Sequence, residues 1–421
     1  MTERYPMRPI TPEEFDAFGE VPTEAFNDTA WPAEAIEQER LVFEFDRSLA
    51  AFDGDAIVGT AAAYSFQLTV PGGTADAAGV SFVSVRPSYR RRGILSAMMR
   101  HQLAGIADRG EAIAALFASE PGIYGRYGYG CASGQLRLTI RRGEGALRAD
   151  LASRPGPDHG SVRLRAGPPA ELRRELAKVY DSAVPHRPGM MARNEPWWQS
   201  LFADPEFARH GMSSLKGLLA EDDSGPRGYA LYRTKPDRTD DDLPSGRLSV
   251  RELIAADATA TAALWTDLLT RDLIGEVVAS PRPVDDPLLD MLADRRRARA
   301  YLTDGLWIRL TDVPAALRQR RYSCAADVVI EVTDELLPAN AGRWRLQCPG
   351  PTDGGTASCE RTTAAADIAA PVEVLGACYL GGTRLGSLAA AGLAVERKHG
   401  ALVRLSAAMY ADPAPWCPWI F

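Results

Sequence analysis

The stretch from Val83 to Leu95 has the composition of a phosphate-binding turn. An apolar run at 80–85 predicts a strand, three arginines follow at 90–92, and a helical pattern begins after Gly93. Backbone N–H groups at a helix start lack partners within the helix and carry the positive end of its dipole, so they bind phosphate oxygens. Glycine lets a pyrophosphate approach the backbone, and arginine adds charge. The alternative is an arginine-rich surface loop, because short basic motifs often arise by chance.

The end of the same strand predicts a second kind of contact. Exposed backbone groups of a strand edge near Val83, Ser84 and Val85 would hydrogen-bond to an extended amide ligand such as a pantetheine arm. The turn matches neither the G-x-x-x-x-G-K-[ST] loop nor the G-x-G-x-x-G turn of other nucleotide-binding proteins.

A glycine- and tyrosine-rich turn, SEPGIYGRYGYG, occupies 119–130. The Tyr124 phenol would supply a proton near the end of a bound cofactor. The alternative is a packed turn in which that hydroxyl binds a backbone carbonyl. Cys131 could indicate an acyl-cysteine intermediate, but no histidine lies near it in sequence, and a small buried thiol is the better interpretation.

A strand–helix–strand unit is expected to position both turns. The run at 80–85 is almost wholly apolar, as in the centre of a buried sheet, and 113–118 predicts the next buried strand. Between them 94–107 has helical spacing, and Gly110 stands where a C-terminal cap belongs. The unit predicts neighbouring parallel strands with a right-handed crossover. A capping box at 11–14 predicts a helix after a short N-terminal strand.

The length of 421 residues predicts three domains in a mixed α/β (α+β) fold. Pro- and Gly-rich linkers at 154–160 and 281–287, with a charged stretch at 295–299, set the expected domains at 1–152, 153–290 and 291–421. The second repeats strand then helix at 248–270, but its join, ADATA at 256–260, has neither Gly nor Arg and should not hold a pyrophosphate. The third has strands at 306–310, 328–332 and 343–347, helices from 371 and near 383, and a strand or helix at 402–409.

Composition excludes several classes of protein. The balance of 48 basic against 55 acidic residues gives −7, which argues against a nucleic-acid binder. Six cysteines are spread singly without a C-x-x-C pair, which argues against a structural zinc site and fits a reducing compartment. The N-terminus lacks a signal-peptide pattern, and no apolar run approaches the ~18 residues of a membrane span. We expect a cytoplasmic protein with no metal, no membrane and no nucleic-acid partner.

Together the two turns resemble a known family. Arg90-x-x-Gly93-x-Leu95 is similar to the acyl-CoA motif of GNAT N-acetyltransferases, and the run from Ser81 to Gly130, with RRRGIL and ASEPGIYGRYGYG, resembles the Eis (enhanced intracellular survival) acetyltransferases of actinobacteria. Weaker similarity continues through the rest of the chain. The resemblance implies two tandem GNAT-like domains, the second degenerate, followed by a sterol-carrier-protein-like domain.

The resemblance also implies a site. Acetyl-CoA as cosubstrate would contact residues at the end of the strand, at the helix start and after the next strand: Val83, Ser84, Val85, Arg91, Arg92, Gly93, Ile94, Leu95, Ser96, Ser119 and Glu120. Tyr124 matches the general acid, and the base is the C-terminal carboxylate, here Phe421. The acceptor pocket would be formed by the first two helices and the tail, with Glu24 and Asp28 as acidic candidates or as plain surface carboxylates.

The tail, DPAPWCPWIF, is unusually apolar for a chain end, since free termini are commonly polar and disordered. Anchoring by Trp416, Trp419 and Ile420 would fix the last carboxylate inside the protein. An α-carboxyl normally titrates near ~3.5, and desolvation would raise that value toward a useful base. The alternative is a tail that only covers a core edge.

The expected function is direct acetyl transfer, in a ternary complex, from acetyl-CoA to a primary amine. By the resemblance the acceptors are aminoglycosides or other polyamine-like molecules, and the assembly is a homohexamer. A protein or peptide lysine is the alternative acceptor. A non-catalytic protein that binds acyl-CoA or lipid is the competing class.

Overall fold

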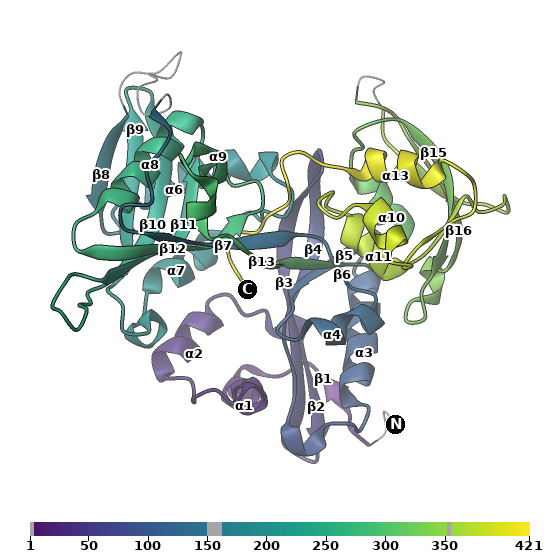
Figure 1. The fold of residues 1–421 in the computed structure, drawn as a ribbon. Coiled ribbons are helices and arrows are strands. Elements are labelled where there is room, and N and C mark those ends of the chain that lie inside the picture. The colour runs from purple at the N-terminus through teal and green to yellow at the C-terminus, as the bar shows by residue number, and fades with distance from the viewer. Residues whose placement is uncertain (1–3, 150–161, 352–354) are drawn as a thin grey trace. The chain divides into compact units, whose positions relative to one another are not determined.

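The computed structural model describes residues 4–149, 162–351 and 355–421, and Figure 1 shows it as a ribbon. The chain divides into two compact units. The first comprises Met1–Ser133, Gly305–Asp412 and Phe421, and the second comprises Gly134–Asp304 and Pro413–Ile420. Both contain strands and helices, which confirms the mixed α/β prediction.

The N-terminal part of the first unit is built around a seven-stranded sheet. Its order is β1 (Met7–Arg8), β2 (Ser48–Asp53), β3 (Ala56–Val70), β4 (Gly73–Val85), β5 (Ile113–Phe117), β14 (Leu306–Leu310) and β6 (Gly130–Cys131). Strands β4 and β5 pair in parallel and are connected by α3 (Ile94–Asp108), which confirms the predicted strand–helix–strand unit. Strand β14 comes from late in the chain and is antiparallel to both of its neighbours.

Short helices surround this sheet. They are η1 (Pro12–Glu14), α1 (Phe15–Phe26), α2 (Ala33–Arg40), η2 (Phe45–Arg47), η3 (Pro87–Tyr89), α4 (Pro121–Tyr124) and η4 (Gly125–Tyr127). The predicted capping box is present, since the Thr11 backbone N–H donates to Glu14 at 2.9 Å. Helix α1 buries Phe15, Phe18 and Val21 in an aromatic cluster against the strands.

The run at 80–85 belongs to β4, the central strand of this sheet, as predicted, but it is only partly buried. Strand β4 shifts its register against β3 between the pairs Ala62–Ser81 and Thr60–Ser84, and Phe82 has a left-handed backbone with φ of 56°. Such a bulge adds one residue to a strand and redirects its side chains. Val80 and Ser84 are buried, but Phe82 and Val83 are half-buried. The apolar residues here therefore line an opening in the sheet.

The C-terminal part of the first unit has a second sheet. Its order is β17 (Ser358–Arg361), β16 (Gly342–Cys348), β15 (Ala326–Thr333), β18 (Ile368–Pro371) and β19 (Val395–Glu396). The helical elements of this part are α10 (Val313–Gln319), η8 (Pro338–Asn340), α11 (Val372–Cys378), α12 (Leu385–Ala390) and α13 (Ala401–Met409). The segment at 402–409, for which strand and helix were both open, is therefore helical.

The second unit repeats the parallel arrangement. Its sheet has the order β13 (Tyr301–Asp304), β7 (Gly134–Arg141), β12 (Ile274–Pro283), β11 (Gly246–Ala255), β10 (Gly225–Lys235), β9 (Lys216–Asp222) and β8 (Arg163–Gly167). Its helices are α6 (Arg173–Ala183), η5 (Val184–His186), α7 (Glu195–Ala203), η6 (Glu206–Arg209), α8 (Ala258–Thr270), α9 (Leu288–Met291) and η7 (Arg295–Ala298). Parallel strands β11 and β12 are joined by α8.

The compact units do not follow the linkers predicted from composition. They divide at Ser133/Gly134 and Asp304/Gly305, because β7 joins the second sheet and β14 returns to the first. The linker predicted at 154–160 lies outside the described residues. The one at 281–287 begins inside the second sheet, since β12 extends to Pro283 and Arg282 is 4% exposed, whereas Val284, Asp285 and Pro287 are exposed. An ion pair with Asp286 at 2.5 Å allows the charge of Arg282 to be buried.

Candidate active site

The two parallel strands of the first sheet diverge after a short pairing. Strands β4 and β5 pair only from Ala77–Ile113 to Gly79–Ala115. Beyond that point β4 continues to Val85 against β3, while β5 continues to Phe117 against β14. The divergence opens a gap in the sheet, and the predicted residues Val83, Ser84 and Val85 lie along it.

Thr60 fixes the bulge at the edge of this gap. Its hydroxyl donates to the Phe82 carbonyl at 2.8 Å and lies 2.6 Å from the Ser84 hydroxyl. The Ser84 side chain is therefore engaged, and a ligand in the gap would meet this residue through its backbone. The bulge also sends Ser81 and Phe82, which are adjacent in sequence, toward the same cavity.

The start of α3 is open. Gly93 is the N-cap residue, with φ of 80°, and no side chain caps the helix. Glycine tolerates this backbone conformation without strain. Ile94 is buried, so only its backbone faces the turn, whereas Leu95 and Ser96 are half-buried. The arrangement leaves first-turn N–H groups available to an anion.

The three arginines of the turn differ in their partners. Arg90 donates to the Ala25 carbonyl at 3.0 Å, and Arg92 donates to the Tyr5 hydroxyl at 3.2 Å and to the Ser88 carbonyl at 2.9 Å. Arg91 is exposed and makes no hydrogen bond or ion pair with the described residues. Arg91 is therefore the guanidinium most available for a phosphate.

The second turn contacts the first through α3. The hydroxyls of Ser96 and Tyr127 lie 3.1 Å apart. Ser119 and Glu120 follow β5 directly and are exposed. All of the predicted donor-binding residues thus belong to the first unit, at the end of β4, the start of α3 and the end of β5.

Tyr124 is buried, with 6% of the residue exposed, in a cluster with Ala78, Val80 and Leu116. Burial raises its pKa to about 12, with smaller contributions from the Glu120 carboxylate and Tyr127. The hydroxyl makes no hydrogen bond within the described part of the chain, so the packed turn with a bond to a carbonyl is not what forms. A phenol of this kind keeps its proton at neutral pH until a stronger base develops beside it.

The tail is anchored by hydrogen bonds from Trp416 and Trp419. In the second unit, Trp416 N–H donates to the Pro188 carbonyl at 2.8 Å, and Trp419 Nε1 donates to the Tyr180 hydroxyl at 3.0 Å. Ile420, expected as an anchor, is instead 64% exposed because its side chain packs on neither core.

Phe421 lies in the first unit, on β3, β4 and β5. Its ring centroid is 4.8 Å from that of Phe66 and 5.5 Å from that of Phe117. The Ser81 hydroxyl donates to its terminal oxygen at 3.3 Å. A Cβ added at Gly79 would lie 3.0 Å from the Phe421 ring and 2.2 Å from that of Phe66, so only glycine leaves room for both rings.

Tyr124 and Phe421 approach the gap from opposite faces of the sheet. Successive residues of a strand face opposite sides. Tyr124 clusters with Ala78, Val80 and Leu116, whereas Phe421 contacts Gly79 and Phe117. A phenol on one face and a carboxyl group on the other therefore flank the place where the strands separate.

A cavity of about 240 Å³ adjoins Phe421. Its lining includes Phe26, Asp28, Trp31, Glu39 and Tyr64, with Ser81 and Phe82 of the bulge. Burial raises the pKa of Glu39, and a hydrogen bond from the Tyr64 hydroxyl opposes that rise.

A neighbouring cavity of about 380 Å³ shares Thr23 and Trp31 with the first and is lined by Asp16, Glu20 and Glu24. Arg86 pairs with Glu24 and, at 3.3 Å, with Glu20. Carboxylates thus outnumber the cation that lines these two cavities.

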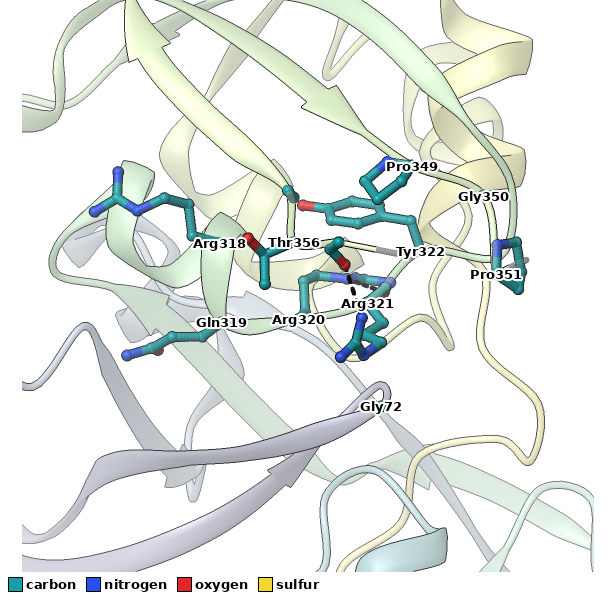
Figure 2. A pocket seen from close by; sticks show the side chains of 12 residues that line it. Gly72, Arg318, Gln319, Arg320, Arg321, Tyr322, Pro349, Gly350, Pro351 and Thr356 are labelled. Carbon is teal, nitrogen blue, oxygen red and sulfur yellow. Dashed lines mark hydrogen bonds between the residues drawn. The ribbon is translucent and has the colours of Figure 1, made fainter. Parts of the chain in front are cut away.

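A third cavity of the first unit, about 140 Å³, is shown in Figure 2. Its lining is rich in arginine, but Arg320 is 2% exposed and donates to the carbonyls of Cys378, Tyr379 and Met409. Arg321 donates to the Gly355 carbonyl at 2.9 Å. These side chains join loops of the C-terminal part, which is a structural role.

Sequence reasoning missed Thr60, Phe82, Glu39 and Tyr64. The bulge had no signal, because a phenylalanine rarely adopts a left-handed backbone. Glu39 and Tyr64 are 25 residues apart and meet only through the fold. No group of three or more potential metal ligands occurs among the described residues, and no described helix has the length and apolar character to cross a membrane. None of the six cysteines forms a disulfide, and the Cys131 thiol donates to the Ser133 carbonyl.

Comparison with known proteins assigns the class. Models of an acetyltransferase (GNAT) domain match residues 6–132 and 189–310, and a sterol carrier protein domain model matches 313–418. The expected order of two GNAT domains and a sterol-carrier-like domain is confirmed, and the protein is a GNAT N-acetyltransferase.

The relatives narrow the class to a family. An uncharacterized N-acetyltransferase of Streptomyces avermitilis is 44% identical over 94% of each chain. The N-acetyltransferase Eis of Mycobacterium tuberculosis is 40% identical over 85% of this chain and 84% of its own. The crystal structure of Eis1 from Mycobacterium abscessus matches with a TM-score of 0.81 at 33% identity, covering 99% of this chain and all of that one. The chain belongs to the Eis family of N-acetyltransferases.

Proposed function

We propose that this enzyme transfers an acetyl group directly from acetyl-CoA to a primary amine of a small polycation, such as an aminoglycoside or another polyamine-like molecule. The observation that carries the proposal is the approach of Tyr124 and Phe421 to one gap in the sheet from opposite faces. A donor on the Tyr124 face and an acceptor on the Phe421 face would meet there without a covalent enzyme intermediate.

The donor side fits the charge and shape of acetyl-CoA. The open start of α3 at Gly93 and the unpaired Arg91 suit a pyrophosphate. The edge of β4 at Val83 to Val85 suits the amides of the pantetheine arm, which would bring the thioester toward Tyr124. Ser119 and Glu120 would complete the contacts after β5.

The acceptor side fits a polycation. Asp28, Glu39 and the Phe421 carboxylate border one cavity, and Asp16, Glu20 and Glu24 border its neighbour. Ammonium groups are attracted to such carboxylates, and the aromatic walls of Phe26 and Trp31 add cation–π contacts. The acidic candidates Glu24 and Asp28 thus line two neighbouring cavities, one residue in each.

Each residue has one role in the transfer. The Phe421 carboxylate, through water, takes a proton from the substrate ammonium, and the free amine forms a C–N bond with the thioester carbonyl carbon. A backbone N–H near Val83 would stabilise the developing oxyanion. As the C–S bond breaks, the adduct nitrogen loses its second proton to water, and Tyr124 donates its proton to the departing thiolate. Solvent then returns a proton to Tyr124 and takes one from the Phe421 carboxyl group.

The terminal carboxylate gives the sharpest test. Adding one glycine after Phe421 keeps the ring but converts its carboxylate into an amide, while Phe421→Leu keeps the carboxylate and alters the ring. We expect the extension, and deletion of Phe421, to lower kcat by at least about tenfold. Both should leave acetyl-CoA affinity within about twofold, and the leucine variant should retain more activity. Equal turnover of the extended and native proteins would refute the role of this carboxylate.

The acceptor class is tested by measuring thiol release from acetyl-CoA across aminoglycosides, linear polyamines and lysine peptides. We expect the polycations to have the highest kcat/KM, because their charge matches both cavities. A preference for lysine peptides would instead assign the alternative acceptor. The hexamer and the cytoplasmic location that the family resemblance implies stay predictions, and sedimentation of the purified protein tests the first.

A further inference from the structure

The second unit contains a cavity of about 670 Å³ that the proposed transfer does not use. It adjoins the end of β11 at Leu253–Ala256, Thr261 of α8 and the end of β12 at Arg282. Strands β11 and β12 pair from Gly246–Ile274 to Val250–Ala279 and then diverge. The cavity lies beyond that divergence, and its volume is in the range of small-molecule sites.

The charge of the lining has one sign. Five basic side chains line the cavity, Lys178, His186, Arg187, Arg227 and Arg282, and none of its lining residues is Asp or Glu. Ser182, Ser224 and Thr261 add hydroxyl groups. The whole chain carries −7, so a cavity lined in this way is not a consequence of overall composition.

Each arginine of the lining forms an ion pair with an aspartate outside the lining and keeps at least one N–H group that has no partner among the described residues. Arg187 pairs with Asp285 at 2.7 Å, Arg227 with Asp257 at 2.5 Å and Arg282 with Asp286 at 2.5 Å. These acids lie outside the lining. They orient the guanidinium groups while leaving nitrogen atoms available. Arg187 Nη2 and Arg227 Nη1, for instance, take part in no hydrogen bond within the described chain.

Arg282 is the most constrained of the three. It is 4% exposed, Nε bonds Asp286, and Nη1 donates to the Leu253 carbonyl at 2.8 Å, which bridges the diverging strands. Its Nη2 makes no hydrogen bond with described residues, yet it is not among the buried unpaired atoms. Because the residue lines the cavity, this nitrogen reaches solvent through it. A nearly buried donor is therefore aimed into the space.

The start of α8 cannot bind an anion in the way proposed for a pyrophosphate at the start of α3. Asp257 caps α8, since its side chain accepts the Ala260 N–H at 2.8 Å. This carboxylate occupies the helix start and would repel a diphosphate. The remaining walls are apolar and include Val179, Met190, Ile254 and Trp416.

We propose that the cavity binds a small organic anion, with one phosphate or carboxylate group on an apolar body. The anionic group would lie against Arg282, Arg187 and Lys178, and the apolar body against Met190, Ile254 and Trp416. The site is separate from acetyl transfer, so its test does not depend on the proposed reaction.

The test is calorimetric titration of the full chain, saturated with CoA to occupy the donor site, with phenyl phosphate, benzoate and inorganic phosphate. We expect saturable binding of one phenyl phosphate or benzoate per chain, at least about tenfold tighter than inorganic phosphate because the apolar walls contribute. Whichever aromatic probe binds more tightly identifies the anionic group. The absence of saturable binding by all three compounds would overturn the proposal. If inorganic phosphate bound as tightly as phenyl phosphate, the proposed contact between an apolar body and the apolar walls would be wrong.

Two variants locate the binding. Lys178→Glu reverses a charge at the cavity, and Arg174→Glu makes the same change on α6 at an exposed residue outside the lining. We expect at least a tenfold loss of phenyl phosphate affinity in the first and less than twofold in the second. An equal loss in both would indicate a general charge effect and refute the site. Ser182→Trp, which fills the cavity without changing charge, should abolish binding, and thermal melting of each variant verifies its fold.

Discussion

The two parallel strand–helix–strand units of this chain differ most at the start of their helices. After β4, the chain makes an eight-residue turn at 86–93 and enters α3 through Gly93, which has no side chain to cap the helix. After β11, only Ala256 and Asp257 intervene, and Asp257 caps α8 itself. The same topology thus has an N-terminus open to an anion in one unit and an N-terminus satisfied from within in the other.

The gaps between the diverging strands also differ, because a side chain crosses the gap in the second unit. Between β4 and β5 the bulge at Phe82 redirects side chains, and the described residues make no side-chain hydrogen bond from one of these strands to the other. Between β11 and β12 the Arg282 side chain crosses from one strand to the carbonyl of the other. If the first unit binds the donor as we propose, divergent parallel strands do not suffice for a donor site, which also needs an uncapped helix and an unobstructed gap.

An aspartate cap like Asp257, placed at the start of α3 in the first unit, should have the largest effect on acetyl transfer. Gly93→Asp brings a carboxylate to the start of α3, where it competes with the pyrophosphate and repels it. We expect the Kd for acetyl-CoA, measured by calorimetry, to rise about 100-fold, equivalent to roughly 2.7 kcal/mol. Gly93→Asn is the matched control, because it has the same shape without the charge. Equal losses in the two variants would show that backbone strain, not charge, decides.

Removal of the Tyr124 hydroxyl comes next. Tyr124→Phe should lower kcat about 100-fold, within the range of general acids, with little change in acetyl-CoA affinity. The pKa of about 12 means that the protonated acid persists above the ordinary tyrosine range. The native kcat/KM should therefore show no decline attributable to this group between pH 7 and 10. A falling limb near pH 10 that disappears in the phenylalanine variant would contradict the assignment.

The elements around the turn at 90–93 could be predicted from local sequence patterns, and the family resemblance placed Asp28 and Phe421 in an acceptor pocket, but nothing in the sequence pointed to Glu39 and Tyr64. The turn at 90–93 and Tyr124 lie within 35 residues and follow one strand–helix–strand pattern, so periodicity and glycine placement were enough. The cavity proposed for the acceptor joins Asp28, Glu39, Tyr64 and Phe421, which are distant in sequence and meet only in the folded chain. The same limit explains why Arg282 and Asp286 of the predicted linker at 281–287 are buried, since Asp286 compensates Arg282 only after folding.

Neutralising the acceptor side should have a smaller effect than changing the donor side. Glu39→Gln removes a partly buried charge that faces the cavity but takes no part in the proton transfers. We expect KM for a polycationic acceptor to rise about tenfold, equivalent to roughly 1.4 kcal/mol, with kcat nearly unchanged. Glu37→Gln, on the exposed side of α2, is the control and should leave KM within twofold. A fall in kcat with constant KM would move Glu39 from binding into the chemistry.

The reciprocal change in the second unit should have the smallest effect on transfer. Asp257→Ala removes the cap of α8 and should cost about 1 kcal/mol of stability, a fall in Tm of about 2–4 °C. The kcat should stay within twofold, and calorimetry should still find one acetyl-CoA per chain, because Arg282 continues to bridge the strands. If this variant bound a second equivalent of acetyl-CoA, the Asp257 cap alone would be what prevents the second unit from binding the donor. One equivalent would mean that the bridge and the short join exclude the donor even when the helix start is free.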